Sequence, residues 1–566
     1  MKHPAHARSA LFSTATALIL AGGLSACAGT ANGTTSAGSG GSGSGGTTLV
    51  VGTDNGSPTM ADNFNPFSAN KRSGTAYMYE PLEYVNSING QQTPFLATGH
   101  TLKGSTAVDF TIRTGVKWSD GKPFTPADVV FTFDYIKKYP ALDSLGIWQH
   151  VKSVSASGNT VSVKFKAPDV PFVQQLEQQL IVPEHIWSKI SDPTTYTNTS
   201  PVVTGPYVVG TFNPNQYTLL KNTKYWQAGN VAATRIVFPA LTGNTQSQLE
   251  LSQGGYDWAT LFIPSVKTTW VAKDAQHNKY WFPPGGTISL FLNLTKKPYS
   301  DPAFRQALSY ALDRTQIATK AEDGYVQPAS QSGMLLPNLK SWLDPALPDS
   351  GLVTQNMTKA TQMFAQAGYT KKGGTLVSAA GKAVTMTLQT PNGFTDWLQA
   401  AQVIQQQLKA VGITVNVQTP QYAAYNQALA NGSFDASIAS FGGTGSPYLD
   451  FFDAFDSAQS APVGKPAASN YSRFSDPKLN GLLTKLQGET QIAQQHSTVN
   501  QLEQIMYKQV PVLALFYGAT WGEYTTKNFT GWPDASNPYA PPAPYGAATA
   551  ATGPPLMIIT HLKAAA

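Results

Sequence analysis

The chain has 566 residues, of which 41% are hydrophobic, 12% are charged and a single one, Cys27, is a cysteine. One thiol excludes an intramolecular disulfide and a cysteine-rich zinc site, so burial must stabilise the fold. The net charge of +6 is too small and too dispersed to indicate nucleic-acid binding, and an aromatic fraction of 11% argues against a disordered chain.

The N-terminus has the features of a secretory signal. Lys2 and Arg8 precede an apolar stretch, residues 10–21, that is too short to span a membrane. Next comes Leu24-Ser25-Ala26-Cys27, which resembles the bacterial lipobox, where cleavage precedes a cysteine that becomes acylated. We therefore expect a signal peptide over residues 1–26, lipidation of Cys27, and an extracytoplasmic protein that touches the cell membrane through its lipid anchor only. An ordinary signal with a chance cysteine is the alternative.

A linker follows the cysteine. Residues 28–48 are dominated by Gly, Ser, Thr and Ala, a composition that behaves as a flexible coil, so we expect a tether over residues 27–48. Residues 38–43 match G-x-G-x-x-G by spelling, but no strand precedes them and no helix follows, so they do not predict a dinucleotide site.

The first half of the body alternates between strand and helix patterns. Strands are predicted at residues 48–53 and 108–112, in a hairpin over residues 151–165, and in a pair at residues 205–209 and 217–220. Thr125-Pro126-Ala127-Asp128 is typical of a helix start, with Thr125 as N-cap and an acidic Asp128 in the first turn. A second capped helix is expected after Ser300-Asp301-Pro302.

Residues 384–417 form the clearest unit. Apolar residues alternate, then follow helical spacing up to Gly412, and then alternate again, which predicts two parallel strands joined by a right-handed helical crossover. A final strand is expected over residues 556–560, after a segment rich in Pro and Ala.

Several of these pieces, in this order, resemble solute-binding protein family 5 of ABC importers, which contains oligopeptide, dipeptide and nickel receptors. The strongest block runs from Phe110 to Phe131 and includes Gly115-Val116-Lys117-Trp118-Ser119-Asp120-Gly121. Later blocks are Thr204-Gly205-Pro206-Tyr207 with Lys224-Tyr225-Trp226, the stretch from Asp301 to Arg314, and Gly432-Ser433-Phe434-Asp435-Ala436.

The resemblance implies an α/β fold of the two-lobed periplasmic-binding-protein kind, type II with an extra inserted domain and a hinge between the lobes. The expected division places lobe 1 at residues 49–95, 203–293 and 526–566, the inserted domain at 96–202, and lobe 2 at 294–525.

Motifs for catalysis and for cofactors are absent from the sequence. The histidine spacing excludes H-E-x-x-H, no P-loop is present, and no G-x-S-x-G occurs. Acidic pairs such as Asp450 and Asp453 are compatible with a glycosidase, but spacing alone does not set the separation of their carboxyl groups. We expect no catalytic residue, no metal and no cofactor.

The ligand is expected between the lobes, where aromatic walls and a few polar groups bind a solute. Aromatic and glycine-rich segments at residues 255–262 and 440–450 are the main candidates. In peptide-binding relatives an aspartate of the second segment pairs with the ligand's α-amino group, and Asp450 is the nearest match, although Pro-Tyr-Leu-Asp stands here in place of Tyr-Pro-Asp-Pro. The candidate ligand-binding residues are Trp258, Phe262, Trp397, Phe441, Tyr448, Asp450 and Trp521.

These features together predict a monomeric, lipid-anchored receptor that passes solute to an ABC permease and its ATPase. Oligopeptides are the first expectation for the solute. Neutral cello- or xylo-oligosaccharides are the alternative, because the chain has low charge and many Trp, Tyr, Asn and Gln side chains. A secreted hydrolase, or a surface module without transport, are the other classes considered.

Overall fold

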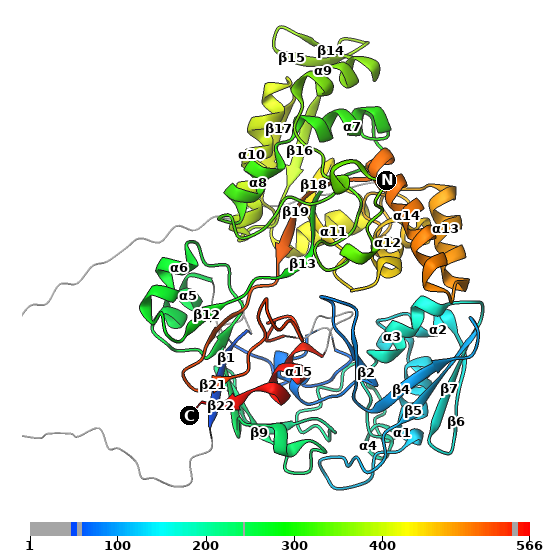
Figure 1. Ribbon diagram of the computed structural model, residues 1–566, viewed down its shortest axis with the longest axis vertical. Helices are drawn as coiled ribbons and strands as arrows, with labels where there is room; N and C mark the ends of the chain where they lie inside the picture. Colours follow the sequence, from blue (N-terminus) through cyan, green and yellow to red (C-terminus); the bar gives the residue numbers. More distant parts are fainter. Residues whose placement is uncertain (1–46, 54–58, 69, 241–243, 546–552, 566) are drawn as a thin grey trace, which may run out of the picture. The chain divides into compact units, whose positions relative to one another are not determined.

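The computed structural model describes residues 47–53, 59–68, 70–240, 244–545 and 553–565, which fold around two separate central sheets (Figure 1). The predicted signal peptide, Cys27 and nearly all of the tether lie outside the described residues. The fold is mixed α/β, as predicted, and its two central sheets form the two lobes that the resemblance implied.

The first lobe is built on a seven-stranded sheet. Its middle strand β1 (Thr48–Gly52) runs parallel to both of its neighbours, β10 (Arg235–Pro239) and β11 (Trp258–Ala259). The outer strands are β9 (Gln216–Lys221) and β8 (Tyr207–Asn213) on one side, and β20 (Glu523–Thr525) and β12 (Asn278–Tyr280) on the other. The helices α5 (Asn244–Ser252) and α6 (Val266–Thr269) carry Leu251 and Val266 into a smaller core beside β11.

A second, antiparallel sheet belongs to the same lobe. It consists of β4 (Ala97–Leu102), β5 (Ala107–Ile112), β7 (Thr160–Phe165) and β6 (Val151–Ser157), accompanied by α1 (Pro126–Lys138), α2 (Ile147–His150), α3 (Val173–Glu177) and α4 (Glu184–Trp187). A short hairpin, β2 (Glu83–Val85) and β3 (Gln92–Pro94), precedes it. Buried side chains of both sheets belong to one continuous hydrophobic cluster, so this insertion packs firmly on the lobe.

The second lobe contains a five-stranded sheet in the order β17 (Thr414–Gln418), β16 (Thr385–Gln389), β18 (Ala436–Phe441), β13 (Pro284–Leu292) and β19 (Val512–Ala519). Successive residues of a strand face opposite sides. Leu290 and Leu292 of β13 therefore join one hydrophobic cluster, while Phe291 joins the other.

The two clusters correspond to two layers of helices. One layer contains α7 (Pro302–Ala311), α8 (Arg314–Ala321), α9 (Met357–Gln366) and α10 (Thr395–Ala410), with the hairpin β14 (Tyr369–Lys372) and β15 (Thr375–Ser378) at its end. The other contains α11 (Tyr422–Asn431), α12 (Pro447–Phe455), α13 (Pro477–Gly488) and α14 (Ile492–Gln509). The sheet is thus covered on both faces, as parallel strands require.

Most of the predicted elements are confirmed. Helix α1 starts with a capping box in which the backbone N–H of Thr125 donates to Asp128 Oδ2 at 2.9 Å. The predicted strand–helix–strand unit is β16, α10 and β17, with parallel strands in the register Thr385 to Thr414, and Gly412 ends the unit's helix with a φ of +89°.

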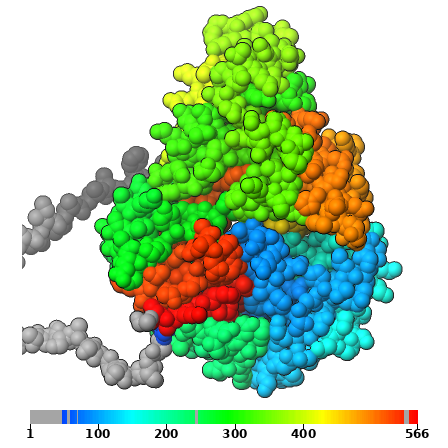
Figure 2. Space-filling model, in the orientation of Figure 1, coloured from blue at the N-terminus to red at the C-terminus, as the bar shows by residue number. Residues whose placement is uncertain are grey.

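The predicted strand at residues 556–560 is wrong. These residues lie in α15 (Pro554–His561), because Pro554 and Pro555 occupy the first helical turn, where proline is favoured. A short apolar run fits a strand and a buried helix equally well, so its periodicity could not decide. Two short strands, β21 (Phe529–Thr530) and β22 (Lys563–Ala564), hold the C-terminal segment, drawn in red on the surface of the first lobe in Figure 2.

The strand pairing places two borders between the lobes at other positions than expected. β13 pairs with β18 and β19 in the second lobe, although residues up to 293 were expected in lobe 1. β20 pairs with β11 and β12 in the first lobe, although residues up to 525 were expected in lobe 2. The chain therefore crosses between the lobes just before residue 284 and just after residue 519.

Candidate functional site

The two crossing segments run side by side and are hydrogen-bonded to one another. The backbone N–H of Thr520 donates to Pro283 O at 2.7 Å, and the N–H of Trp281 donates to Gly522 O at 2.9 Å. Because every path between the two lobes' sheets passes through these residues, the pair of segments is the place where a change in lobe orientation would be absorbed.

A cavity of about 280 Å³, called here the crossing cavity, lies directly beside these segments. The two crossings, the second lobe and the C-terminal segment all contribute residues to its lining. It is lined by Gly285, Gly286, Ile288, Glu322, Phe394, Asp396, Trp397, Ser440, Gly518, Ala519, Thr520, Trp521 and Tyr545. Aromatic side chains with a few convergent polar groups are typical of a small-molecule site.

The polar groups of the crossing cavity are mainly two carboxyl groups. Glu322, just after α8, is 1% exposed, and Asp396, in the first turn of α10, is half-buried. Burial, and then the neighbouring Asp396 carboxyl, raise the pKa of Glu322 well above its ordinary value. Burial also raises the pKa of Asp396. Two close carboxyl groups in such surroundings disfavour ionisation of both at once.

A second cavity of about 400 Å³ lies between the inserted sheet's helices and the second lobe. Gln174 of α3 lines it, and its Nε2 donates to the backbone oxygen of Thr444 at 2.7 Å, which links the two lobes. Tyr448 of α12 lines the same cavity, and its hydroxyl accepts a hydrogen bond from Gln487 Nε2 at 2.8 Å.

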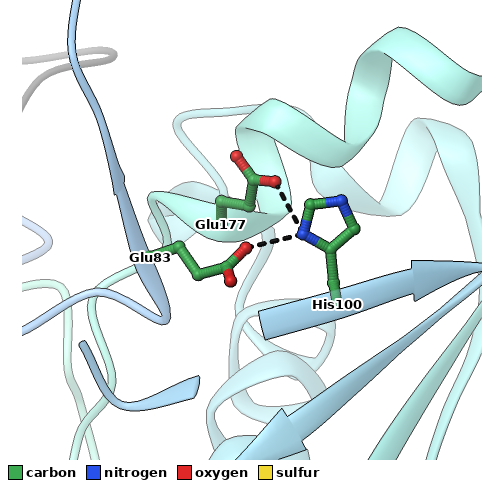
Figure 3. Close-up of side chains that lie close together, drawn as sticks. All are labelled: Glu83, His100 and Glu177. Atoms are coloured by element: carbon green, nitrogen blue, oxygen red, sulfur yellow. Dashed lines mark hydrogen bonds and ion pairs between the residues drawn. The ribbon is translucent and has the colours of Figure 1, made fainter. Parts of the chain in front are cut away.

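A histidine beside this second cavity lies between two glutamates (Figure 3). His100 Nδ1 lies 2.6 Å from Glu83 Oε2 and 3.1 Å from Glu177 Oε1, and Gln92 Nε2 donates to the same Glu177 oxygen at 2.7 Å. Burial, with Glu83 as the next cause, raises the pKa of Glu177 well above its ordinary value. One ring nitrogen serves both carboxyl groups at hydrogen-bond distances, so a shared proton explains this cluster without a metal ion.

Three of the predicted ligand-binding residues line these cavities. Trp397 and Trp521 stand in the wall of the crossing cavity, and Tyr448 lines the second one. Phe262 lies behind the crossing cavity, with its ring 5.3 Å from that of Trp521 in an edge-to-face contact. The structure therefore brings Phe262 and Trp521 together, and places Trp397 on the same cavity as Trp521.

The structure places the other three predicted residues among buried side chains, and their contact with a solute stays a prediction. Trp258 is fully buried, and its Nε1 donates to Pro542 O at 2.8 Å, so its ring is part of the core of the first lobe. Phe441 packs against Phe455 with ring centres 5.1 Å apart. Asp450 is 2% exposed, and its Oδ1 accepts hydrogen bonds from Thr444 rather than facing solvent. None of the three presents free surface to a solute in this structure.

Sequence analysis missed the two carboxyl groups in the crossing cavity. Glu322 and Asp396 are separated by 73 intervening positions, and Asp396 stands in the first turn of a helix, where an acidic residue has an ordinary structural explanation. The Asp323-Gly324 turn after Glu322 was the available signal, since loops at strand and helix ends often carry function.

Among the described residues, no helix has the length and hydrophobicity needed to cross a membrane.

Residues 91–462 match the model of bacterial extracellular solute-binding proteins, family 5 middle. The chain is 26% identical over 527 residues to the oligopeptide-binding protein AppA of Bacillus subtilis, covering 90% of this chain and 93% of AppA. It is 24% identical to OppA of the same organism, covering 78% of this chain and 83% of OppA.

Solved structures show the same fold. The periplasmic oligopeptide-binding protein of Thermotoga maritima aligns with a TM-score of 0.84 and 26% identity over 92% of this chain and 99% of its own. A mannohexaose-bound structure of that protein aligns with a TM-score of 0.79 and 27% identity over 92% of this chain and 98% of its own. Bacillus subtilis AppA in complex with a nonapeptide aligns with a TM-score of 0.71 and 24% identity over 92% of this chain and 99% of its own.

Proposed function

Because the chain belongs to the bacterial extracellular solute-binding proteins of family 5, we propose that it captures oligopeptides between its two lobes and delivers them to an ABC permease and its ATPase. The observation that carries the proposal is the crossing cavity, which lies where the lobes join and is lined by residues of both. Relatives that are named oligopeptide-binding proteins support the same solute class.

Capture would work by shifting the equilibrium between open and closed lobe arrangements. A solute that contacts both lobes only in the closed arrangement stabilises that arrangement by its differential affinity. The two hydrogen-bonded crossings, with Gly285, Gly286 and Gly518 in the cavity lining, are the natural hinge.

The experiment is solute capture by the purified full-length chain. Thermal shift and mass spectrometry after incubation with a defined peptide pool are expected to show stabilisation and co-purifying peptides. Absence of both with every peptide pool would contradict the peptide assignment.

Neutral oligosaccharides are a second candidate. The observation in their favour is the mannohexaose bound to the Thermotoga maritima protein, together with Trp397 and Trp521 in the crossing cavity, since sugars stack on aromatic rings. Mannohexaose and cello- or xylo-oligosaccharides therefore form a parallel arm of the same thermal-shift experiment. Family membership supports a receptor of either kind over the hydrolase alternative.

We further propose that the receptor is extracytoplasmic and anchored by acylation of Cys27, the chain's one cysteine, at the lipobox-like sequence. Cys27→Ala is expected to leave solute capture unchanged and to move the protein from the membrane fraction to the soluble fraction. Membrane retention of this variant would refute the anchor.

A further inference from the structure

A third connection, which is not covalent, joins the two lobes beside the crossings. It links the segment at the start of α6 in the first lobe to the turn that follows α8 in the second lobe. The backbone N–H of Ser265 donates to Asp323 Oδ2 at 2.6 Å, and the N–H of Val266 donates to the Tyr325 hydroxyl at 2.6 Å. The same hydroxyl donates to Ile263 O at 2.9 Å. These three hydrogen bonds are called here the interlobe clasp.

The Tyr325 side chain belongs to the second lobe but packs against the first. Its ring contacts the smaller hydrophobic cluster beside β11, and its centre lies 5.3 Å from that of Phe282 in an edge-to-face contact. Burial raises the pKa of Tyr325 to about 12, so the hydroxyl keeps the proton that it donates to Ile263 O. One hydroxyl of the second lobe therefore serves both a backbone donor and a backbone acceptor of the first lobe.

Two partners in the clasp, Ser265 and Asp323, have a strained backbone. The φ of Ser265 is +50° and that of Asp323 is +51°, in the left-handed region where a residue with a Cβ atom loses free energy. Such conformations persist only where the surrounding contacts enforce them. Because the two strained residues are hydrogen-bonded to each other across the lobes, opening of the clasp would allow both to relax.

The lobes meet at the clasp through a small contact rather than a packed interface. A hollow of about 650 Å³ lies beside it and is lined by Ser265 and Lys267 from the first lobe and by Asp323 and Tyr325 from the second. Ser265 and Asp323 are exposed, so water replaces their hydrogen bond readily when it breaks. A small gain in hydrogen bonding that is set against backbone strain leaves a contact that breaks and re-forms without unfolding either lobe.

The other described hydrogen bond between the lobes that involves α3 lacks this strain. Gln174 Nε2 donates to Thr444 O at 2.7 Å, and neither residue has a positive φ. We propose that the interlobe clasp is a conformational device that favours the lobe arrangement of this structure in the absence of solute and releases the lobes when Asp323 and Tyr325 leave the α6 segment. The clasp thereby sets the fraction of solute-free chains in that arrangement, and with it the apparent affinity for a solute that binds this arrangement.

The distance between the lobes tests the clasp without any solute. Because Cys27 is the chain's one cysteine, a Cys27→Ala chain accepts two fluorophores at exposed positions, Ser155→Cys in β6 and Thr484→Cys in α13. Single-molecule energy transfer then gives the ratio of the main distance population to all others. Asp323→Ala removes an acceptor and is expected to lower this ratio about fivefold. Ser265→Gly keeps the N–H donor and removes the strain, so it is expected to raise the same ratio about threefold.

Matched controls make the same chemical changes within one lobe. Asp192→Ala removes an exposed aspartate that accepts a backbone hydrogen bond in the first lobe, and Ser350→Gly removes a φ of +55° in the second. Both should keep the wild-type ratio, whereas Tyr325→Phe should lower it as Asp323→Ala does. Unchanged ratios in both Asp323→Ala and Tyr325→Phe would overturn the clasp, as would a shift of Ser265→Gly in the same direction as these two.

Peptide capture relates the clasp to the proposed function, on which this part of the test rests. Asp323→Ala should bind a defined peptide pool more weakly than the wild type, and Ser265→Gly more tightly. Neither change should exceed the change in the population ratio, because the variants alter only the fraction of competent chains. If no chain captures peptide, the proposed function fails, and the energy-transfer ratios still decide the clasp. A wild-type affinity in variants whose ratios have shifted would refute the link between the clasp and capture.

Discussion

Substitution of Asp450 tests whether this aspartate of α12 supports the glycine-rich loop at Thr444 or binds the solute. Its Oδ1 accepts two hydrogen bonds from Thr444, and the side chain is 2% exposed. Thr444 in turn accepts the hydrogen bond from Gln174 of the other lobe through its backbone oxygen. The structure therefore assigns Asp450 to the support of an interlobe contact.

The expected magnitudes follow from the surroundings of the carboxyl group. Asp450→Ala leaves a half-buried N–H and a half-buried hydroxyl of Thr444 without their acceptor, at the lower end of about 1–3 kcal/mol for each group, so we expect a loss of roughly 2–4 kcal/mol in the free energy of unfolding. Asp450→Asn keeps an oxygen acceptor and removes a buried charge, so a change within about 1 kcal/mol at pH 7.5 is expected.

The raised pKa of Asp450 also determines how the unfolding free energy changes with pH. Burial raises the pKa of Asp450 from 3.8 to about 6. The folded chain thus binds more protons than the unfolded chain between these values, and the unfolding free energy falls as pH rises through this window, by about 3 kcal/mol for this group. Asp450→Asn should lack that fall.

Urea denaturation followed by tryptophan fluorescence at pH 4.5 and 7.5 measures these differences, and the peptide capture experiment runs in parallel. Asp134→Ala is the control, since Asp134 is exposed on α1 and belongs to another element than the loop and its helix. Lost peptide capture by Asp450→Asn with unchanged stability would refute the reasoning and return Asp450 to the ligand. So would a cost below about 1 kcal/mol for Asp450→Ala.

Three further changes test the scaffold. Glu503 is fully buried with a pKa raised by burial to about 8, so Glu503→Gln should remove a fall in unfolding free energy of about 1.4 kcal/mol per pH unit between pH 4.5 and 8, measured as melting temperature against pH. Trp258→Phe removes the donor to Pro542 O and should cost about 2–4 kcal/mol in urea denaturation with peptide affinity unchanged, whereas an affinity loss alone would mark Trp258 as a ligand contact. Gly443→Ala places a Cβ against the backbone oxygen of Gly285 at a φ of +89°, so stability should fall by more than about 1 kcal/mol and peptide affinity should fall with it. Normal behaviour in both assays would show that this contact is not required.

The secondary structure was predictable wherever local chemistry and periodicity agreed. The N-cap of α1 and the unit β16, α10 and β17 were identified because Thr125, Asp128 and Gly412 act on their own neighbours in the chain. The run at residues 556–560 failed because its helix is stabilised by proline at its start and by tertiary burial, which a short apolar pattern does not reveal.

Aromatic residues were only partly assigned from sequence. The sequence does not distinguish a tryptophan whose ring lines a cavity from one buried in the core. Trp397 is of the first kind, and Trp258, whose N–H donates to a core carbonyl, is of the second. Which of the two occurs depends on how distant segments pack, since Pro542 lies 284 residues from Trp258. Burial of an amphipathic ring is therefore a tertiary property.

The choice between peptides and oligosaccharides depends on the same tertiary contacts rather than on overall composition. The low charge of the chain pointed toward neutral sugars, but a composition averages over the whole surface, whereas a ligand meets only the lining of its cavity. In the crossing cavity the two acidic groups, Glu322 and Asp396, meet no basic residue among those described, so the local balance is negative although the chain as a whole carries +6. An amine satisfies that balance by charge and by hydrogen bonds, whereas a sugar hydroxyl supplies only hydrogen bonds.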